Sequence, residues 1–263
     1  MKKIILILTV IFVIFPLFGE SDPREIMALV NARDTGDSAV SDMEMVLVDQ
    51  QERQRSRSIK SYMLDDGEVS RTVMFFTAPG DVRGTGFLTW DYEEESKDDE
   101  QWLYLPALRK TNRIAGSDKS QSFMGSDFNY SDMNAADLNE FNYTLIQEGK
   151  VDGQDVWVIM AVPVSRDIAR ETGYEKSALF IRKDNYMIVR AKKWTLRSGE
   201  EKFMQVKEMR IIDGIWIPTR MEMTTRRNGS FYHQTLLNRS NIRINIPMDE
   251  NMFTVSGLER GIQ

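Results

Sequence analysis

The sequence of 263 residues contains no cysteine and a single histidine, His233. Disulfide bonds, thiolate zinc sites, cysteine nucleophiles and a lipidated N-terminal cysteine are therefore excluded. A metal site that needs two histidine ligands is excluded as well. Basic residues are in the minority, because 34 Lys and Arg stand against 40 Asp and Glu, which gives a net charge of −6. This acidity argues against a broad nucleic-acid-binding surface, so we expect no nucleic-acid partner.

Long apolar runs are missing, apart from one near the N-terminus. Residues 4–18 are apolar except for Thr9 and Pro16, follow two lysines, and lead directly into a polar stretch. The run is shorter than the ~20 residues of a membrane-spanning helix. It predicts a secretory signal peptide over residues 1–19, cut between positions 19 and 21, with an uncleaved anchor as the alternative. The exported chain, which lacks a cysteine for lipidation, is expected to be a soluble periplasmic protein.

After the signal, the sequence is dominated by strand patterns. From residue 38 onward apolar residues recur at every second position over many short stretches. Asp-Gly or Asn-Gly pairs, which favour two-residue hairpin turns, occur at 66–67, 152–153, 213–214 and 228–229. Ten to twelve strands joined by short turns predict an antiparallel meander that curls into a barrel or a deep half-barrel. No linker and no repeat is evident, so residues 20–263 are predicted to form one domain.

Only short helices are expected. Asp22 followed by Pro23 predicts a helix over about residues 23–33. The polar middle of the chain, residues 107–142, contains a predicted short helix capped by Ser131 or Asp132. Another is predicted around residues 166–171. We expect these helices on the concave face of one curved sheet, because strands do not alternate with long helices as in doubly wound α/β folds.

Motifs for catalysis or metal binding have simpler explanations. The sequence has no G-x-S-x-G nucleophile elbow, and His233 lies in a strand-like run where a wall residue is more usual than a base. The acidic residues 91–100 offer oxygen ligands for calcium, but without EF-hand spacing they are typical of an exposed hairpin tip. Arg53, Arg55 and Arg57 alternate and predict a row on one solvated strand face. No catalytic residue, metal site or cofactor is predicted.

Methionine and aromatic residues are the more informative feature. The chain has 16 methionines, and its aromatic residues gather in or near the strands that flank the polar middle. Flexible thioethers suit surfaces that accept varied apolar ligands. A deeply curved sheet either fills its interior with such side chains or leaves a cavity, and these residues alone leave both possibilities open.

Several stretches together resemble a known protein family. They are VRGTGFL at 82–88, WLYLPALRK at 102–110, Arg113 with Ile114, SFMGSDF at 122–128, Asp132, GIWIP at 214–218, Met221, FT at 253–254 and LER at 258–260. The pattern is similar to the LolA-like outer-membrane lipoprotein-sorting protein family over nearly the whole chain. That resemblance implies a mainly β fold, in which one strongly curved antiparallel sheet of about eleven strands forms a half-barrel. A few short helices would cover a hydrophobic cavity.

The resemblance also implies a function. The expected protein is a periplasmic carrier that shields the acyl chains of a lipoprotein or other lipid and passes it towards the outer membrane, beside an RND-type transporter. Its partners would be that lipid or acylated lipoprotein, an inner-membrane transporter and an outer-membrane acceptor, with the carrier a monomer without cofactor. A lipid-sensing or accessory subunit of an envelope transporter or stress system is an alternative. A lipid-acting hydrolase, calcium-dependent through the acidic segments, is another.

The resemblance finally suggests site residues. The predicted cavity or lid residues are Phe87, Trp90, Trp102, Tyr104, Phe123, Met124 and Phe128. The arginines predicted to contact a head group or a partner are Arg71, Arg83, Arg109 and Arg113, of which Arg71 and Arg83 are candidates for controlling cargo release. Ser126 and Asp127 are expected to do no more than cap a turn. Shielding would stabilise cargo by ~0.8 kcal/mol per buried CH₂ group.

Overall fold

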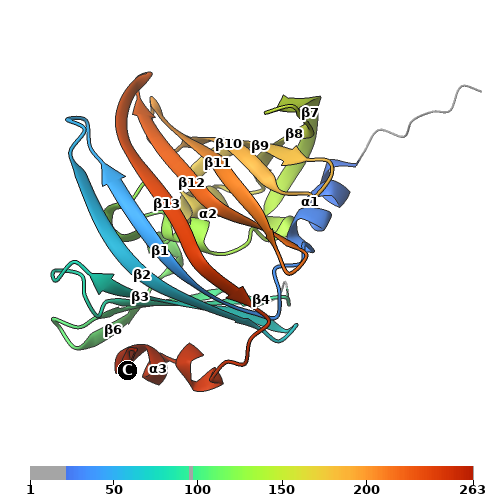
Figure 1. Cartoon of the computed structure of the whole chain (residues 1–263). Coiled ribbons are helices and arrows are strands. Elements are labelled where there is room, and N and C mark those ends of the chain that lie inside the picture. The colour runs from blue at the N-terminus through green and yellow to red at the C-terminus, as the bar shows by residue number, and fades with distance from the viewer. Residues whose placement is uncertain (1–21, 95–96, 263) are drawn as a thin grey trace, which may run out of the picture.

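The computed structural model describes residues 22–94 and 97–262 (Figure 1). The predicted signal peptide, residues 1–19, lies outside the described residues. Among the helices that are described, none has both the length and the hydropathy needed to cross a membrane.

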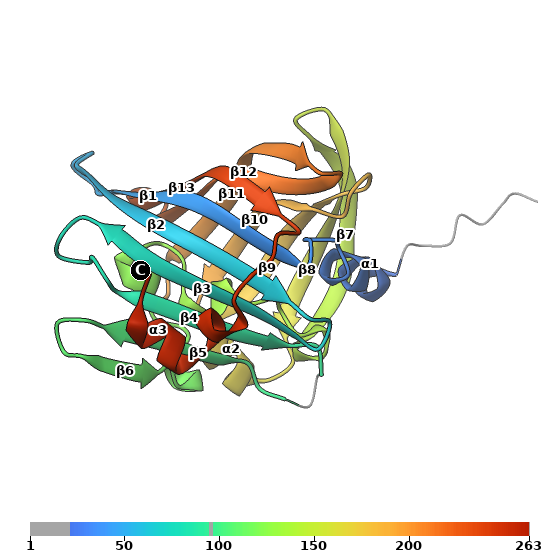
Figure 2. The same cartoon turned by 60° about the horizontal axis from the view of Figure 1, so that its bottom comes forward.

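A single antiparallel sheet of 13 strands forms the body of the molecule (Figures 1 and 2). Its order is β6-β5-β4-β3-β2-β1-β13-β12-β11-β10-β9-β8-β7, so β6 and β7 are its edges and the sheet does not close into a barrel. The strands are β1 (Ser38–Val48), β2 (Gln54–Asp65), β3 (Val69–Ala78), β4 (Gly86–Tyr92), β5 (Glu100–Leu105), β6 (Lys110–Arg113), β7 (Phe141–Val151), β8 (Gln154–Pro163), β9 (Tyr174–Arg182), β10 (Ile188–Thr195), β11 (Glu200–Ile212), β12 (Ile215–Arg227) and β13 (Ser230–Ile244). The predicted mainly β fold with one curved antiparallel sheet is confirmed.

The strand count corrects the prediction of about eleven. Of the 13 strands, β6 had no signal in the sequence, because its four residues, Lys110 to Arg113, are all polar. It lies at an edge and pairs only with β5, so neither of its faces needs to be apolar. A periodicity argument detects a strand only where one face is buried.

The predicted turns join consecutive strands as expected. At residues 152–153, 213–214 and 228–229 both members of the Asp-Gly or Asn-Gly pair have positive φ angles. That conformation defines the two-residue type I′ hairpin turn. At residues 66–67 only the glycine has a positive φ, so the β2–β3 connection is of another kind.

The helices are short, and two begin where the sequence predicts. They are α1 (Pro23–Asn31), α2 (Arg166–Thr172) and α3 (Val255–Arg260), with 3₁₀ turns η1 (Gly116–Asp118), η2 (Phe123–Gly125), η3 (Tyr130–Met133), η4 (Leu138–Glu140) and η5 (Glu250–Phe253). Asp22 caps α1 by accepting from the Arg24 backbone N–H at 2.8 Å. The helix predicted to be capped at Ser131 or Asp132 is instead η3, whose cap, Asn129, lies two residues before Ser131. Asp132 completes that capping box from inside the turn.

Alternation along the strands gives the sheet two distinct faces. On β4, Phe87 lies in a cluster with residues of the segment 114–140, whereas Leu88 lies in a cluster with α3. We call the side that bears Phe87 the inner face and the side that bears Leu88 the outer face. The sheet curves around α2 and the segment 114–140, while α3 packs outside on β3–β5 (Figure 2). Helix α1 covers the inner face at β8–β10.

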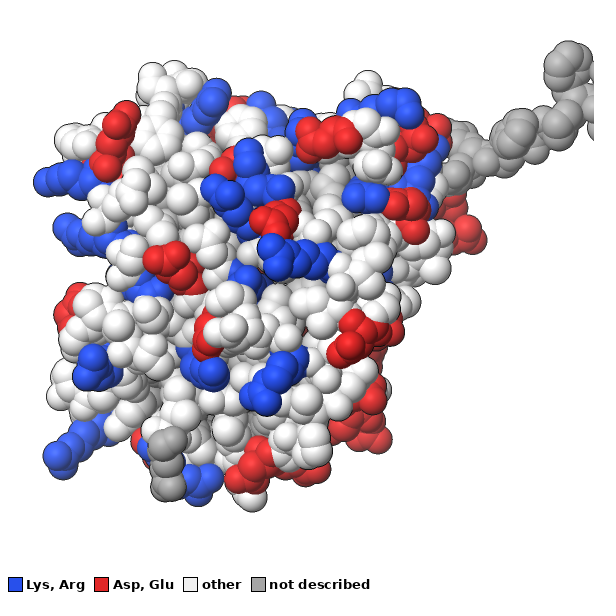
Figure 3. All heavy atoms as spheres, in the orientation of Figure 1, with Lys and Arg blue, Asp and Glu red and all other residues white. Residues whose placement is uncertain are grey.

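The side of the molecule seen in Figure 3 carries positive and negative side chains that are interspersed rather than gathered by sign. Several outer-face charges form ion pairs, such as Lys192 with Glu201 at 2.8 Å and Lys207 with Glu222 at 3.4 Å. Exposed pairs of this kind contribute little stability. Because positive and negative side chains are mixed, the side seen in Figure 3 has no extended basic patch.

Candidate functional site

The segment 114–140, which we call the plug, connects edge strand β6 to edge strand β7 across the inner face (Figure 1). Two of its aromatic rings are buried against Phe87 of β4. The ring centroid of Phe123 lies 4.9 Å, and that of Tyr130 5.7 Å, from the centroid of Phe87. Met45 of β1 and Phe76 of β3 belong to the same cluster. The plug is therefore packed against the β1–β4 half of the sheet by apolar contacts.

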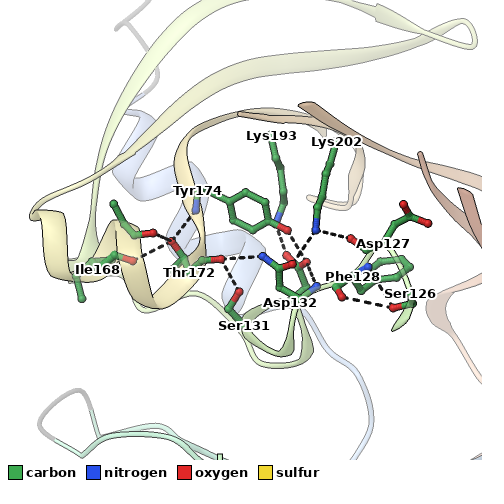
Figure 4. A network of polar contacts seen from close by, with 12 residues as sticks. Ser126, Asp127, Phe128, Ser131, Asp132, Ile168, Thr172, Tyr174, Lys193 and Lys202 are labelled. Carbon is green, nitrogen blue, oxygen red and sulfur yellow. Dashed lines mark hydrogen bonds and ion pairs between the residues drawn. The ribbon is translucent and has the colours of Figure 1, made fainter. Parts of the chain in front are cut away.

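Polar contacts hold the plug to the other half of the sheet (Figure 4). Asp127 is only 4% exposed, and its Oδ2 accepts a hydrogen bond from the Thr235 hydroxyl at 2.6 Å. His233 Nδ1 lies 2.7 Å from the same oxygen, and the Thr225 hydroxyl donates to Oδ1. Lys202 of β11 donates to the backbone carbonyl of Asp127 at 2.7 Å. One plug residue thus contacts three consecutive strands, β11, β12 and β13.

A second buried carboxylate continues this network. Asp132 contacts Lys193 Nζ at 2.5 Å and accepts from the Tyr174 hydroxyl at 2.6 Å and the Asn129 backbone N–H at 2.8 Å. Burial alone would raise the pKa of Asp132, but Lys193 and Lys202 outweigh it and hold this pKa below its usual range. Burial lowers the pKa of Lys202 and raises that of Tyr174. The Asp132 carboxylate is therefore held as an anion inside the fold.

The Asp127–His233 pair has the geometry of two members of a hydrolytic triad. A third member would have to be a hydroxyl at His233 Nε2, and no hydroxyl in the described ranges is hydrogen-bonded there. The hydroxyls of Thr225 and Thr235 are hydrogen-bonded to Asp127 itself. This arrangement attaches the plug to the sheet, and it lacks an activated nucleophile.

The inner face beside the plug is apolar and rich in methionine. Its half-buried residues come from strands of both halves of the sheet and are Met43, Met63, Met74, Met204, Met221 and Leu237. Their alternation with outward-pointing polar residues follows the strand period of two. Unbranched thioethers adapt to irregular apolar partners, so this surface suits a flexible hydrocarbon ligand.

A groove of about 470 Å³ lies on the outer face and has a different character. Its lining includes Lys192, Phe203 and Arg226, and these residues alternate with Ala191 and Met204, which pack beneath α1. Charged groups around this groove make it a poor site for an acyl chain, because burying them would cost free energy. The inner face is the better candidate for apolar cargo.

Comparison with known proteins agrees with this description. A model of a family described as "uncharacterized protein" matches residues 68–260. A domain from Vibrio parahaemolyticus assigned to outer membrane lipoprotein sorting is 30% identical, with a TM-score of 0.80, and the match covers 90% of this chain and 98% of that one. The chain belongs to the LolA-like outer-membrane lipoprotein-sorting protein family. The recognition drawn from the sequence motifs is confirmed.

Two further solved structures are similar to the chain. A DUF1329 family protein from Desulfovibrio piger is 29% identical, with a TM-score of 0.79, over 90% of this chain and 97% of that one. A LolA superfamily protein from Nitrosomonas europaea is 18% identical, with a TM-score of 0.66, over 89% of this chain and 98% of that one, and shows the shared fold. No curated protein matches the chain.

The residues predicted to line the family's cavity fall into two groups. Phe87, Phe123 and Met124 meet at the inner face, where Phe87 and Phe123 are almost fully buried. Phe128 is also buried, within the plug. Met124 has a left-handed backbone with φ of 50°, and its carbonyl accepts a hydrogen bond from Arg57 of β2. Phe87, Phe123 and Met124 form part of the joint between plug and sheet. Contact of all four residues with cargo stays a prediction.

Trp90, Trp102 and Tyr104 lie on the opposite face from Phe87. They pack against the buried Phe253 and Leu258 near the C-terminus, and Trp90 Nε1 donates to the Phe253 carbonyl at 2.9 Å. Trp90 is three residues after Phe87 on one strand, and residues an odd number apart point to opposite faces. The structure thus does not bring all seven residues together, and contact of these three with cargo stays a prediction.

The four predicted arginines lie at the surface or on the outer face. Arg71 forms an ion pair with Asp66 at 2.8 Å, and Arg113 forms one with Glu100 at 2.8 Å. Arg83 and Arg109 are exposed in the β3–β4 and β5–β6 connections. Their predicted role in head-group or partner contact remains a prediction, and it suits a partner at the rim better than a ligand on the inner face.

The network residues on the inner face were not anticipated. Asp127 was expected only to cap a turn, and Arg57 was placed in a solvated row, yet Arg57 points inward to the plug. Lys202 lies on the same, inward-facing side of β11 as Met204 and Val206. A lone cation at an inward position of an alternating strand is the signal that would have identified such residues.

The acidic hairpin predicted as an exposed tip is partly buried. Asp91 accepts from the Ala135 backbone N–H of the plug at 2.8 Å. Burial, followed by the neighbouring carboxylate of Asp99, raises the pKa of Asp91 to about 7. Burial also raises the pKa of Asp99. The two carboxyl groups therefore favour holding a proton at the plug contact below neutral pH.

Asp91→Asn should change the pH dependence of stability. An unfolded chain loses this proton near pH 4, whereas the folded protein keeps it to about pH 7, so stability declines as pH rises through that interval. We expect the variant to be more stable than the native protein by about 1–2 kcal/mol at pH 8 and equal to it at pH 4. Urea unfolding at both values measures this. Asp98→Asn, an exposed acid of the same hairpin, is the control, and a gain that is the same at both pH values would contradict the assignment.

Proposed function

We propose that this protein is a periplasmic carrier that shields the acyl chains of a lipoprotein or another lipid on the inner face of its sheet. The observation that carries the proposal is the apolar, methionine-rich inner face, which is covered by a segment attached through a few specific contacts. A carrier needs a surface that is apolar when loaded and covered when empty. Residues 20–263 would act as one lipid-binding domain.

Cargo binding would exchange one set of apolar contacts for another. Phe123 and Tyr130 now occupy the inner face beside Phe87, and an acyl chain would take over part of that contact. Such an exchange is nearly neutral in hydrophobic free energy, so the polar contacts of Asp127 and Asp132 would set the balance between covered and open states. The plug would then be displaced from the inner face when cargo is bound and would cover that face again after release.

The sequence and the family support a setting in the cell envelope. The predicted signal peptide and the lipoprotein-sorting assignment of the Vibrio parahaemolyticus relative support a periplasmic location. An inner-membrane transporter of the RND type would supply the cargo, and an outer-membrane acceptor would receive it. Exposed Arg83 and Arg109 offer these partners positive charge at the rim. A monomer would suffice, because the plug that covers the inner face belongs to the same chain.

A disulfide lock tests the proposal directly. The chain has no cysteine, so a double variant Asp127→Cys, Thr235→Cys can form only one intramolecular disulfide. These positions adjoin, since the Asp127 backbone nitrogen lies 2.9 Å from the Thr235 hydroxyl. We expect the oxidised protein to take up at least about tenfold less lipid than the reduced protein, because the locked plug cannot leave the inner face.

The measurement is native mass spectrometry after incubation with envelope lipids, with organic extraction of what is bound. Lys150→Cys, Asp155→Cys, on neighbouring exposed positions of β7 and β8, is the matched control and should bind lipid equally in both redox states. Equal uptake by the oxidised and reduced plug variants would contradict a carrier gated by the plug. A native protein that stays free of lipid would contradict the carrier function itself.

A further inference from the structure

One buried cation on the inner face has no counter-charge within the described part of the chain. Arg239 of β13 lies opposite Met43 of β1 and is half-buried. Its Nε is buried without a hydrogen-bond partner, and its Nη2 makes one long contact, 3.4 Å, to the Ser41 hydroxyl. Burial lowers the pKa of Arg239, and no described charged group acts against that effect. The guanidinium nevertheless stays protonated, because arginine does not lose its proton in proteins.

Polar groups gather around Arg239 within an otherwise apolar surface. Ser41 and Ser61 are buried partners across β1 and β2. Thr219 of β12 precedes Arg220, which pairs with Asn238, so it lies beside Arg239 on the neighbouring strand. The Thr219 hydroxyl is buried and, like the Arg239 Nε, has no hydrogen-bond partner. Two unsatisfied donors thus lie side by side on the inner face, next to Leu237 and Met43.

Other cations on the inner face have partners, which makes the unpaired Arg239 unusual among the described residues. Lys193 is paired with Asp132, Lys202 donates to the Asp127 carbonyl, and Arg57 donates to the Met124 carbonyl. Each of these contacts attaches the plug. Arg239 makes no such contact among the described residues, although an unpaired buried charge is strongly unfavourable. A ligand that brings its own negative charge would remove this cost.

We propose that Arg239, with Thr219 and Ser41, binds the anionic head group of the cargo. The inference rests on the proposed carrier function and specifies its substrate class, which is a lipid with a carboxylate or phosphate head group. A guanidinium binds either group through two parallel hydrogen bonds, and the adjacent hydroxyls can donate to a remaining oxygen. The acyl chain would then extend from Arg239 along the neighbouring methionines. The head group, rather than the chain end, would lie near the middle of the sheet.

The test compares a charged and a neutral probe of the same shape. Cis-parinaric acid and its methyl ester report apolar binding by fluorescence, and both can be titrated into the native protein and its variants. Arg239→Met removes the charge and introduces a side chain already common on this face, so folding should be retained. Arg239→Lys keeps the charge. Arg220→Met, an exposed arginine of the adjacent strand, is the matched control.

We expect the native protein to bind the acid about tenfold more tightly than the ester. Arg239→Met should remove this preference and leave ester binding unchanged, whereas Arg239→Lys should keep part of it and Arg220→Met all of it. Equal binding of acid and ester by the native protein would overturn the head-group site while leaving the carrier function intact. Binding of neither probe would overturn the carrier function as well. Competition by submillimolar inorganic phosphate would assign the site to a free anion instead of a lipid.

Discussion

Asp127→Asn should lower the free energy of unfolding by about 3 kcal/mol and loosen the plug. The carboxylate accepts hydrogen bonds from Thr225 and Thr235 and contacts the part-buried His233. Asp127 and both threonines are buried. An amide accepts through one oxygen only, and its N–H₂ group would force a hydroxyl that now donates to the carboxylate, or His233 Nδ1, to act as acceptor instead. Removing one partner from a buried charged network typically costs this much.

Urea unfolding measures the stability, and hydrogen exchange of residues 114–140 measures the plug. Protection in the plug should fall by more than protection in the central strands β1 and β13. Asp118→Asn, an exposed acid within the plug, is the control and should change neither quantity appreciably. A variant that loses stability uniformly, with plug protection falling no faster than that of β1, would show that Asp127 supports the sheet and does not attach the plug.

Leu258→Ala should cost about 3 kcal/mol by opening a cavity between α3 and the outer face. Leu258 is fully buried against β3 and β4, beside Gly86. A Cβ atom at Gly86 would lie 2.6 Å from Leu258 Cδ1, so Gly86→Ala should also destabilise by displacing that side chain. In the double variant the new methyl group occupies part of the space that the leucine vacates. The double variant should therefore be less destabilised than the sum of the two single variants, by about 1 kcal/mol or more.

Thermal and urea unfolding of the four proteins completes this double-mutant cycle. Leu108→Ala, at a leucine that is 67% exposed, is the control and should have almost no effect. Binding of an acyl probe per folded molecule should be unchanged throughout, because α3 covers the face that carries Trp90 and Trp102. Loss of probe binding in Leu258→Ala would instead place the ligand on the outer face. Strict additivity would contradict the packing of Leu258 on Gly86.

Most of the fold could be predicted from local sequence features. The alternation of apolar and polar residues gave the strands, and the Asp-Gly and Asn-Gly pairs gave the hairpins, because both signals act between near neighbours. The edge strand β6 could not be found, since exposure on both faces leaves no pattern. Alternation also held the information that separates Phe87 from Trp90, three residues apart. Aromatic content alone does not say which face of a strand each ring occupies.

The site depended on contacts that sequence patterns do not encode. Asp127 and Thr235 are 108 residues apart, and nothing in the neighbourhood of either residue indicates the other. In the sequence Arg239 resembles an ordinary exposed polar residue. Its burial follows only from the pairing of β13 with β1 on one side and β12 on the other. Burial of a charge is a property of the assembled sheet, so only the register of three strands reveals it. The family resemblance supplied the fold but not these residues.

The connection of the plug has a mechanical consequence. Because it joins β6 to β7, which are the two free edges of the sheet, the plug is a strap fixed at both ends. A strap of this kind cannot swing aside on a hinge; it can only slacken or tighten. Spreading the two edges would draw it taut across the inner face, and bringing them together would let it bow outward. Sheet curvature and access to the inner face are thus coupled. A partner that binds either edge strand would therefore admit or expel cargo without contacting the cargo itself.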